Sequence, residues 1–495
     1  MTSRQYVLSK SKYLQGLQCP KLLWMSYHAK DQFPEIDPQT QAIFDQGHEV
    51  TALAQTLFPG GLEIEGVKDF EAILKKTQEL LPQRKPLFEA ALRYKNTFAR
   101  PDVLTPNKDG SWDLYEVKSS TQVKDVHYED VAFQKYCYEG AGLKIRKVYL
   151  MHINNEYVKN GPIDPEGLLN REDVTEQAQK LATQVEKRVN EMVGILNQKE
   201  CPTISIGPQC NDPYDCPLEE FCWQHIPEDS VFIFNRIRKD KAFAFINEGF
   251  LRVRDVSPER LQSTSHQIIY KCHLENKIHV DPAAIREFIK QLQFPIHFID
   301  FETLGMNIAI PLYDGTRPYQ QVPFQFSLHI LSGPDKELEH HAFLAEGEGD
   351  PRPEFLKRLK VLIGPKGSIV AYNLSFERGR LQESADAYPD YKDWLNGIDG
   401  RFVDLMTPFQ KFDYYDPKQL GRYSIKSVYP ALVGESYDGM TISDGGQASR
   451  EYARVTFSHG VTKEDRRRVY DGLLEYCKLD TKAMVDILNV LSATH

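Results

Sequence analysis

The sequence lacks the features of a membrane or secreted protein. None of its apolar runs approaches the ~20 residues that a membrane-spanning helix needs. Its first residues, MTSRQYVLSKSK, lack the apolar core of a signal peptide. Internal repeats and low-complexity tracts are also absent. We therefore expect a cytoplasmic protein without a membrane partner.

An excess of positive charge is missing as well. The chain has 60 Lys and Arg residues against 70 Asp and Glu residues, a net charge of −10. This balance gives no sign of nucleic-acid binding, but it does not exclude a nuclease. Metal-dependent nucleases need acidic residues, and local basic patches can act within an acidic chain.

Cysteine is scarce and unevenly placed. The 495 residues include eight cysteines, and four of these lie in residues 201–223, CPTISIGPQCNDPYDCPLEEFCW. In a reducing compartment, clustered cysteines indicate metal binding rather than disulfides. Outside the cluster, we expect three cysteines to be ordinary buried thiols: Cys137, Cys272 and Cys477.

Hydrophobic periodicity predicts an α/β protein with two strand-rich parts. Helical spacing predicts helices over 5–30, with an interruption at Pro20, and over 41–56, 69–81, 128–142 and 172–198. Alternating patterns predict strands over 88–94, 100–106, 111–120 and 146–154, and a second series of strands opens at 294–303. The expected organisation is a first domain over 1–225, a helical connector over 226–288 and a second domain over 289–495.

One group of chemically active residues lies on two neighbouring predicted strands. RPDVL places Asp102 at the end of a strand, and YEVKSS places Glu116 and Lys118 two residues apart on the next. Because alternate residues of a strand share a face, Glu116 and Lys118 point into one site. Two carboxylates can hold a divalent metal that polarises a phosphate, and a nearby ammonium offsets developing charge. The alternative is a chance pattern, since Asp followed later by Glu-x-Lys is common.

The same segments resemble the PD-(D/E)XK nuclease superfamily, in its RecB-type branch. DQGHEV matches the branch's upstream His, and QKYCY matches its Q-x-x-x-Y helix. The resemblance implies a restriction-endonuclease-like domain that binds Mg²⁺ or Mn²⁺ and acts on nucleic acid. It implies the metal ligands His48, Asp102 and Glu116, the catalytic residues Asp102, Glu116 and Lys118, and the nucleic-acid-binding residues Gln134 and Tyr138.

Some RecB-type nucleases hold an iron–sulfur cluster with one early cysteine and three late ones. Here the resemblance implies a [4Fe–4S] cluster held by Cys19, Cys210, Cys216 and Cys222. Structural zinc on the same thiolates is the alternative, although the late cysteines are spaced C-x5-C-x5-C and form no short knuckle. Cys201 is a spare that is the alternative to Cys210.

A second group of acidic residues lies in the C-terminal part. HFIDFET places Asp300 and Glu302 two apart on a strand, and LLEYCKLDTKAM places Tyr476 and Asp480 four apart on one helical face. With Glu377 in IVAYNLSFERGRL, these segments resemble the DEDD exonucleases of the RNase H-like fold, in the variant with a catalytic Tyr. The resemblance implies catalytic Asp300, Glu302 and Asp480 that hold two metals, with Tyr476 orienting the attacking water.

One position departs from the DEDD pattern. The second motif of that family ends in Asp, whereas this chain has Glu377, and Asp404 in RFVDLM is the alternative ligand. Lys426 in GRYSIKSVYP is a candidate nucleic-acid contact. GRYSIKSVYP and YDGMTISDGGQA resemble a bacterial nuclease family that joins an exonuclease-like domain to a RecB-like one.

Together these patterns predict a metal-dependent DNA nuclease with two active sites. We expect exonucleolytic or end-processing activity on single-stranded DNA or duplex ends, in DNA repair, CRISPR-related processes or antiphage defence. RNA is the alternative substrate, and a helicase or a defence-system protein is the kind of partner left open. The alternative function is a nucleic-acid-binding scaffold with one or both sites degenerate. An iron–sulfur redox protein is disfavoured because the chain lacks a flavin or nicotinamide fingerprint.

Overall fold

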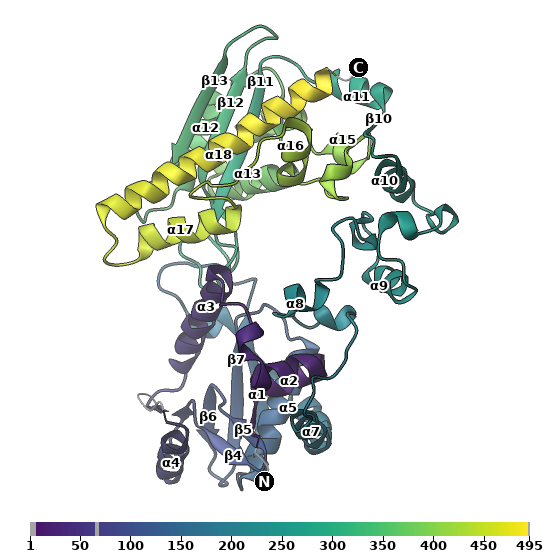
Figure 1. Ribbon diagram of the computed structural model, residues 1–495. Helices are drawn as coiled ribbons and strands as arrows, with labels where there is room; N and C mark the ends of the chain where they lie inside the picture. The colour runs from purple at the N-terminus through teal and green to yellow at the C-terminus, as the bar shows by residue number, and fades with distance from the viewer. Residues whose placement is uncertain (1–5, 65–68, 494–495) are drawn as a thin grey trace. The chain divides into compact units, whose positions relative to one another are not determined.

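The computed structural model describes residues 6–64 and 69–493, and the fold is mixed α/β (Figure 1). The chain forms two compact units. Unit 1 contains the described residues up to His225 together with Asn307–Tyr319. Unit 2 contains Ile226–Met306 and the described residues from Gln320 onward. The expected connector, residues 226–288, is largely helical and belongs to unit 2, whereas Asn307–Tyr319 leaves the expected second domain.

The predicted interruption of the N-terminal helical segment at Pro20 is confirmed, and the segment forms two helices. Helix α1 spans Lys10–Gln18 and α2 spans Pro20–His28, with Cys19 between them in an extended conformation. Proline lacks the N–H that would continue the first helix, so the break falls at this position. Residue 5 of the predicted helix lies outside the described residues. The next helices are α3 (Pro38–Gln55) and α4 (Phe70–Leu80).

Unit 1 is built on a six-stranded sheet. Strands β6 and β7 are antiparallel, β7 and β8 are parallel, and β9 is antiparallel to β8. The strand order is β2 (Leu62–Glu63), β3 (Leu87–Phe88), β6 (Val103–Pro106), β7 (Trp112–Lys118), β8 (Ile145–Ile153) and β9 (Leu169–Asp173). A separate three-stranded sheet has the order β1 (Leu8–Ser9), β5 (Thr97–Ala99) and β4 (Leu92–Tyr94).

The single strand predicted over 88–94 is broken in the structure. Strand β3 ends at Phe88 and β4 begins at Leu92, in a different sheet. Glu89 in between adopts a positive φ of 56°. Side chains other than glycine rarely adopt this backbone conformation, which turns the chain out of the first sheet.

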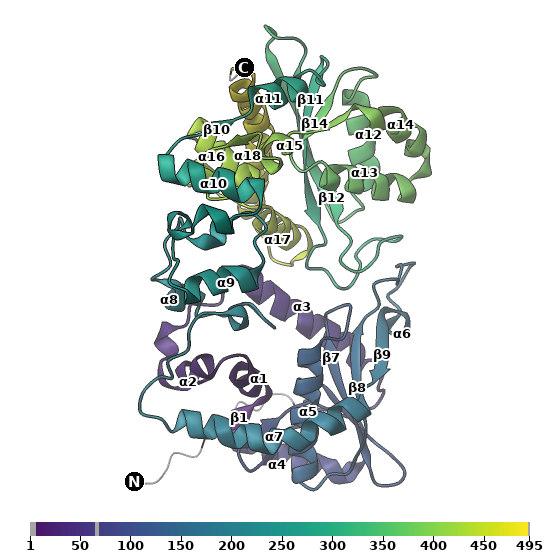
Figure 2. The same ribbon diagram turned by 90° about the vertical axis from the view of Figure 1, so that its right-hand side faces the viewer.

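Helices cover both faces of the six-stranded sheet. On one face, Leu114 of β7 packs in an apolar cluster with α5 (Asp125–Gly140) and α7 (Thr175–Leu196), which lie side by side (Figure 2). On the other face, Tyr115 and Val117 pack with residues of α3. Side chains alternate along a strand, so Glu116 and Lys118 face α5 with Leu114.

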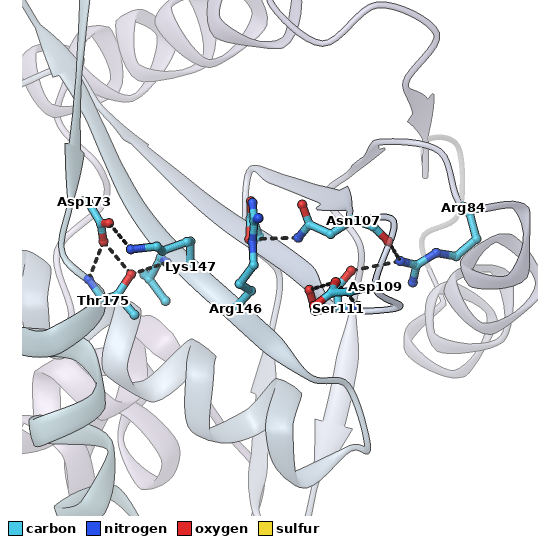
Figure 3. A network of polar contacts seen from close by, with 10 residues as sticks. Arg84, Asn107, Asp109, Ser111, Arg146, Lys147, Asp173 and Thr175 are labelled. Carbon is cyan, nitrogen blue, oxygen red and sulfur yellow. Dashed lines mark hydrogen bonds and ion pairs between the residues drawn. The ribbon is translucent and has the colours of Figure 1, made fainter.

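A polar network holds the turn between β6 and β7 (Figure 3). Nη2 of Arg84 donates to the carbonyls of Asn107 at 2.7 Å and Ser111 at 2.9 Å. The amide of Asn107 donates to Oδ1 of Asp113 at 2.9 Å, and Nε of Arg146 donates to the same oxygen at 3.0 Å. These bonds fix the register of the hairpin that carries the first predicted site.

Residues Asn307–Tyr319 are an insertion from the later sequence into unit 1. Asp314 accepts a 2.6 Å hydrogen bond from Nζ of Lys159, and the hydroxyl of Tyr319 donates to the carbonyl of Ser119. Ser119 directly follows the last residue of β7. Unit 1 is therefore completed by a segment that lies some 80 residues beyond its main part.

Unit 2 is built on a five-stranded sheet. Its order is β13 (Leu338–Leu344), β12 (Val322–Leu331), β11 (Ile296–Leu304), β14 (Ile369–Ala371) and β15 (Phe402–Asp404). The first three are antiparallel, and β14 and β15 run parallel to β11. Helix α18 (Lys463–Ser492) lies on one face, and α12 (Arg352–Leu362) and α13 (Ser375–Ala387) lie on the other (Figure 2).

Strand β11 is irregular where it carries its acidic residues. The pairing with β12 shifts between Glu302 and Thr303, which marks a β-bulge. Bulges bend a strand and redirect its side chains, and they are frequent beside active sites. Just beyond, Gly305 has a φ of 128°, and a Cβ there would lie 2.0 Å from the carbonyl oxygen of Gln320. Only glycine fits where the strand leaves the sheet.

The remaining longer helices complete unit 2. They are α9 (Lys239–Asn247), α10 (Thr264–Glu275), α11 (Pro282–Ile289), α14 (Lys392–Ile398), α16 (Ile425–Val433) and α17 (Gly445–Phe457). Among residues 6–64 and 69–493, no helix combines the length and the apolar character needed to cross a membrane.

Candidate metal centres

The first predicted site forms where β7 faces α5. Nζ of Lys118 donates to Oε1 of Glu116 at 2.7 Å and to Oδ2 of Asp130 at 2.6 Å. The side-chain amide of Gln134 donates to the other oxygen of each carboxylate, Oε2 of Glu116 and Oδ1 of Asp130, both at 2.8 Å. One ammonium and one amide therefore hold the two buried carboxylates together. We call Asp102, Glu116, Lys118 and Asp130 the Glu116 site.

Asp102 joins this site from the neighbouring strand. It lies immediately before β6 and not at the end of a strand, which corrects the expectation from the sequence. Its Oδ2 accepts a hydrogen bond from the backbone N–H of Val117 at 2.6 Å. Burial raises the pKa of Asp102 to about 7, and the charge of Glu116 adds to the effect. A divalent cation between these carboxylates would remove the repulsion.

Lys10 is a member of the site that sequence reasoning missed. Its Nζ donates to Oε1 of Glu116, the oxygen that also accepts from Lys118. Burial opposes its charge, but the carboxylates of Asp130 and Glu116 outweigh burial and raise the pKa of Lys10. The same two ammonium groups outweigh burial at Asp130 and lower the pKa of that carboxyl.

His48, the predicted upstream ligand, is exposed on α3. The structure places it within electrostatic range of Glu89. Burial raises the pKa of the Glu89 carboxyl, while Arg100, which pairs with it at 3.0 Å, acts in the opposite direction. The charges of Glu116 and Lys10 also act on Glu89. Glu89 is thus in electrostatic contact with both His48 and the Glu116 site, and it was not singled out from the sequence.

The structure corrects the nucleic-acid-binding role expected for Gln134 and Tyr138. Both side chains are completely buried. Gln134 bridges Glu116 and Asp130, and the hydroxyl of Tyr138 donates to the carbonyl of Ala90. Neither side chain is available to a nucleic acid in this conformation. Gln134 positions the carboxylates, and Tyr138 belongs to the core.

Four cysteines from both ends of unit 1 line one pocket. Cys19 comes from the junction of α1 and α2, and the other three come from residues 208–223. The pocket contains about 370 Å³ of space not filled by atoms, part of it open to solvent. Its cysteines, which are all free thiols, are Cys19, Cys210, Cys216 and Cys222. We call this the cysteine pocket.

The sulfur atoms of the cysteine pocket influence one another. Burial raises the pKa of Cys216 to about 11, and the charges of Cys210, Cys19 and Cys222 add to the effect. Cys201 packs against the same apolar cluster but does not line the pocket. Thiolates are the ligands of [4Fe–4S] clusters and of structural zinc. Among the described residues, however, no three of these sulfur atoms all lie within 4.8 Å of one another.

The second predicted site lies between β11, α13 and α18. It gathers four buried or largely buried carboxylates, those of Asp300, Glu302, Glu377 and Asp480. Burial raises the pKa of Asp300, and the charge of Asp480 raises it further. Burial also raises the pKa of Glu302 and of Glu377, and the charge of Asp300 adds to both. Burial alone raises the pKa of Asp480, from 3.8 to about 6. We call these residues the Asp300 site.

Cys477 belongs to this second site. Its thiol donates to Oδ2 of Asp300 at 3.3 Å. Ligand atoms of Asp300, Glu302 and Cys477 all lie within 4.8 Å of one another. The expectation of an ordinary buried thiol is therefore incomplete. Cys477 is buried, but it contacts a site carboxylate.

Two tyrosines lie beside Asp480. The hydroxyl of Tyr437 donates to Oδ1 of Asp480 at 2.7 Å, and Tyr476 lies near enough to this carboxylate to lower its pKa. Nζ of Lys426 lies 5.6 Å from the ring centre of Tyr437 and 5.3 Å from that of Tyr476. It donates to the carbonyl of Ser443 at 2.7 Å. Lys426 is therefore an exposed cation beside the two tyrosines. Exposure of this kind is what a contact with a phosphate requires.

Residues 297–424 match a family model described as a domain of unknown function, DUF2779. Uncharacterized protein UU173 of Ureaplasma parvum is 27% identical, over 46% of this chain and 35% of its own. Uncharacterized protein MG366 of Mycoplasma genitalium is 25% identical, over 39% of this chain and 31% of its own. The chain thus spans about a third of the length of these relatives.

The geometry distinguishes Glu377 from Asp404 as a ligand. Asp404 accepts backbone hydrogen bonds from Asn373 at 3.1 Å, Leu374 at 3.2 Å and Met406 at 2.9 Å. Both of its oxygens are thus used to hold the turn before α13. Oε2 of Glu377, by contrast, is buried without a hydrogen-bond partner among the described residues. Glu377 is the better donor for a cation.

The signals for the missed residues differ in kind. Asp130 lies four residues before Gln134 in the predicted helix, so helical spacing placed it on the same face. Tyr437 opens YDGMTISDGGQA, a segment that carries a family resemblance but had no predicted role in a site. Lys10 is one of several lysines in its segment, and no pattern distinguishes it.

Proposed function

We propose that this chain is a metal-dependent nuclease that hydrolyses phosphodiester bonds of DNA at two sites. The observation that carries the proposal is the Asp300 site. Its four carboxylates come from three segments. Burial raises the pKa of each, neighbouring carboxylates add to the rise at Asp300, Glu302 and Glu377, and Oε2 of Glu377 has no hydrogen-bond partner among the described residues. Buried acidic groups of this kind are costly unless they are protonated or bind a cation. DNA supplies the phosphate that such a cation would polarise.

At the Asp300 site, Mg²⁺ or Mn²⁺ would be held by Asp300, Glu302, Glu377 and Asp480, and when bound it supplies Lewis acidity and an acidified water. The hydroxyl of Tyr437 fixes the orientation of Asp480. Tyr476 is the residue we assign to orienting the attacking water. Lys426 would offset negative charge on the phosphate.

At the Glu116 site, Asp102 and Glu116 are the acidic ligands we assign to the metal. Lys118 is held between Glu116 and Asp130, at 2.7 and 2.6 Å. This position lets its ammonium hold a water or offset charge on the phosphate, as the E-x-K pattern of PD-(D/E)XK nucleases implies. His48 would act at the edge of the site, through Glu89.

The sheet arrangements support the finer fold assignments that we propose. In unit 2, three antiparallel strands are followed by two strands parallel to β11 in the order 13-12-11-14-15, which suits an RNase H-like domain. In unit 1, an antiparallel hairpin carries Asp102 and Glu116, a parallel strand follows, and α5 packs on the site, which suits a PD-(D/E)XK domain.

We propose that the cysteine pocket holds a [4Fe–4S] cluster, with Cys19, Cys210, Cys216 and Cys222 as ligands. Such a cluster would join the two ends of unit 1 and stabilise its fold. Anaerobically purified protein is expected to be brown and to contain about four iron atoms per chain. Colourless protein with one zinc per chain would instead show that the pocket holds a structural zinc. Reduced thiols also suit the cytoplasm, where we place the protein.

The function is tested with end-labelled single-stranded DNA, duplex DNA and RNA, in Mg²⁺ or Mn²⁺ and in EDTA. Wild type, Lys118→Ala and Asp300→Ala are compared, with Lys124→Ala and Asp471→Asn as controls outside the two sites. We expect metal-dependent release of nucleotides from DNA, lowered by each site variant and unchanged by the controls. Binding of DNA without cleavage in either metal would refute the proposal in favour of a scaffold, and faster cleavage of RNA would change the substrate.

A further inference from the structure

Helix α1 connects the Glu116 site to the cysteine pocket. Its first residue, Lys10, donates to Oε1 of Glu116, and its C-cap residue, Cys19, lines the cysteine pocket. The helix has nine residues, so with a rise of ~1.5 Å per residue it bridges about 13 Å. A displacement at one end of so short a helix is transmitted to the other.

Both ends of α1 are held by contacts within unit 1. The side-chain amide of Gln18 donates to the carbonyls of Gln209 at 2.9 Å and Tyr214 at 2.7 Å, in the loop that carries three of the pocket cysteines. In its middle, the buried ring of Tyr13 stacks on Phe133 of α5 at 4.8 Å. The helix is thus tied to the cysteine loop and packed against the helix that carries Asp130.

Lys10 and Lys118 donate to the same oxygen of Glu116. A divalent ion that binds this oxygen must displace an ammonium, because the ion and the ammonium would lie on the same side of the oxygen and repel each other. Lys118 also bonds to Asp130 at 2.6 Å and is held on β7. Lys10 comes from a separate helix, and among the described residues its ammonium bonds to one carboxylate, that of Glu116, whereas that of Lys118 bonds to two. Its side chain is 31% exposed, against 21% for Lys118. Lys10 therefore has less to lose by withdrawing.

We propose that Lys10 is a positioning residue that competes with the divalent metal at Glu116, and that the cysteine pocket controls this competition through α1. The inference rests on the proposed metal site at Glu116. When the pocket is filled, Cys19 holds α1 and keeps Lys10 at Glu116. When the pocket is disturbed, α1 loosens, Lys10 leaves and the metal binds more tightly. Because such coupling is reciprocal, metal at Glu116 also favours release of α1 from the pocket.

The test measures Mn²⁺ affinity by the EPR signal of free Mn²⁺, in full-length protein whose second site is disabled by Asp300→Ala and Asp480→Ala. Lys10→Met should lower the dissociation constant about tenfold, within the usual 5- to 150-fold range of couplings between sites. Lys12→Met is the matched control. Lys12 lies on the same helix and bonds to Gln15, and its replacement should leave the affinity unchanged.

The link to the pocket is tested by Gln18→Ala, which unties α1 without removing a cysteine, and by Cys19→Ser. Each substitution should tighten Mn²⁺ binding when Lys10 is retained. Neither should have a further effect when it is combined with Lys10→Met. Gln18→Ala keeps the test decisive if Cys19→Ser does not fold. Unchanged affinity in Lys10→Met, or additive effects in the combined variant, would overturn the inference. If Glu116→Gln does not change Mn²⁺ binding, the metal site itself fails, and with it the proposed function of unit 1.

Discussion

Replacing Asp480 by Asn is expected to stabilise the metal-free protein. The Asp480 carboxyl is buried, and its pKa rises from 3.8 to about 6 because burial disfavours the charged form. Above pH 6 the group is ionised in the folded and the unfolded chain, so the folded state carries an unfavourable charge. Asparagine removes that charge and keeps an oxygen that can accept from Tyr437, which now donates at 2.7 Å.

The size of the effect follows from the pKa. Each tenfold change in an ionisation constant corresponds to about 1.4 kcal/mol, so the rise from 3.8 to about 6 costs about 3 kcal/mol at pH 8. The cost is absent below pH 4 and grows as the pH rises to about 6, because only the folded state then resists ionisation. The amide nitrogen of Asn needs a partner of its own, which reduces the expected net gain to about 2 kcal/mol. For a unit of this size, that raises the melting temperature by about 4 to 8 °C.

The assay is thermal unfolding at pH 8 and at pH 4, in EDTA and in Mg²⁺. The variant should melt higher than wild type at pH 8 in EDTA and equally at pH 4, and Mg²⁺ should stabilise it less than it is expected to stabilise wild type. Asp471→Asn is the control, because Asp471 is an exposed acid on the same helix with its side chain 70% exposed. A lower melting temperature for Asp480→Asn at pH 8 in EDTA would refute the reasoning.

Three further predictions concern other parts of the molecule. Cys216→Ser should lose the brown colour and the bound iron, whereas Cys201→Ser should keep both, because Cys216 lines the pocket and Cys201 does not; equal iron content in the two variants, by metal analysis, would contradict the ligand set. In an Asp300→Ala background, Lys118→Ala should lower the rate of DNA cleavage by about a hundredfold or more, because it removes the ammonium between Glu116 and Asp130; an unchanged single-turnover rate would exclude that role. Tyr319→Phe should lower the free energy of unfolding by about 1 kcal/mol in urea, because it removes the hydrogen bond to the Ser119 carbonyl; unchanged stability would indicate that this contact contributes nothing to unit 1.

Patterns local to one strand or one helix were visible in the sequence. Glu116 and Lys118 share a face of β7 because the period of a strand is two, and Asp480 and Tyr476 share a turn of α18 for the corresponding helical reason. These relations depend only on the backbone, so they survive whatever packs around them. The break between α1 and α2 at Pro20 is local in the same sense.

Relations between distant segments were not visible. Lys10 reaches Glu116 only because α1 packs against α5. Asn307–Tyr319 joins unit 1 only because its apolar residues pack on the face of the six-stranded sheet that α3 also covers. Burial was also misjudged, since the spacing that aligns Gln134 with Tyr138 does not tell whether their shared face meets solvent or the core. Such properties arise from tertiary packing, which single-sequence patterns do not encode.

The central claim is that both acidic clusters hydrolyse phosphodiester bonds with a divalent metal. The most direct measurement is the Mg²⁺-dependent release of nucleotides from end-labelled DNA by wild type and by the double variant Lys118→Ala, Asp300→Ala, purified side by side. The account predicts release by wild type that stops in EDTA, and none by the double variant. Equal release by the two proteins, or none by wild type in Mg²⁺ or Mn²⁺, would contradict it.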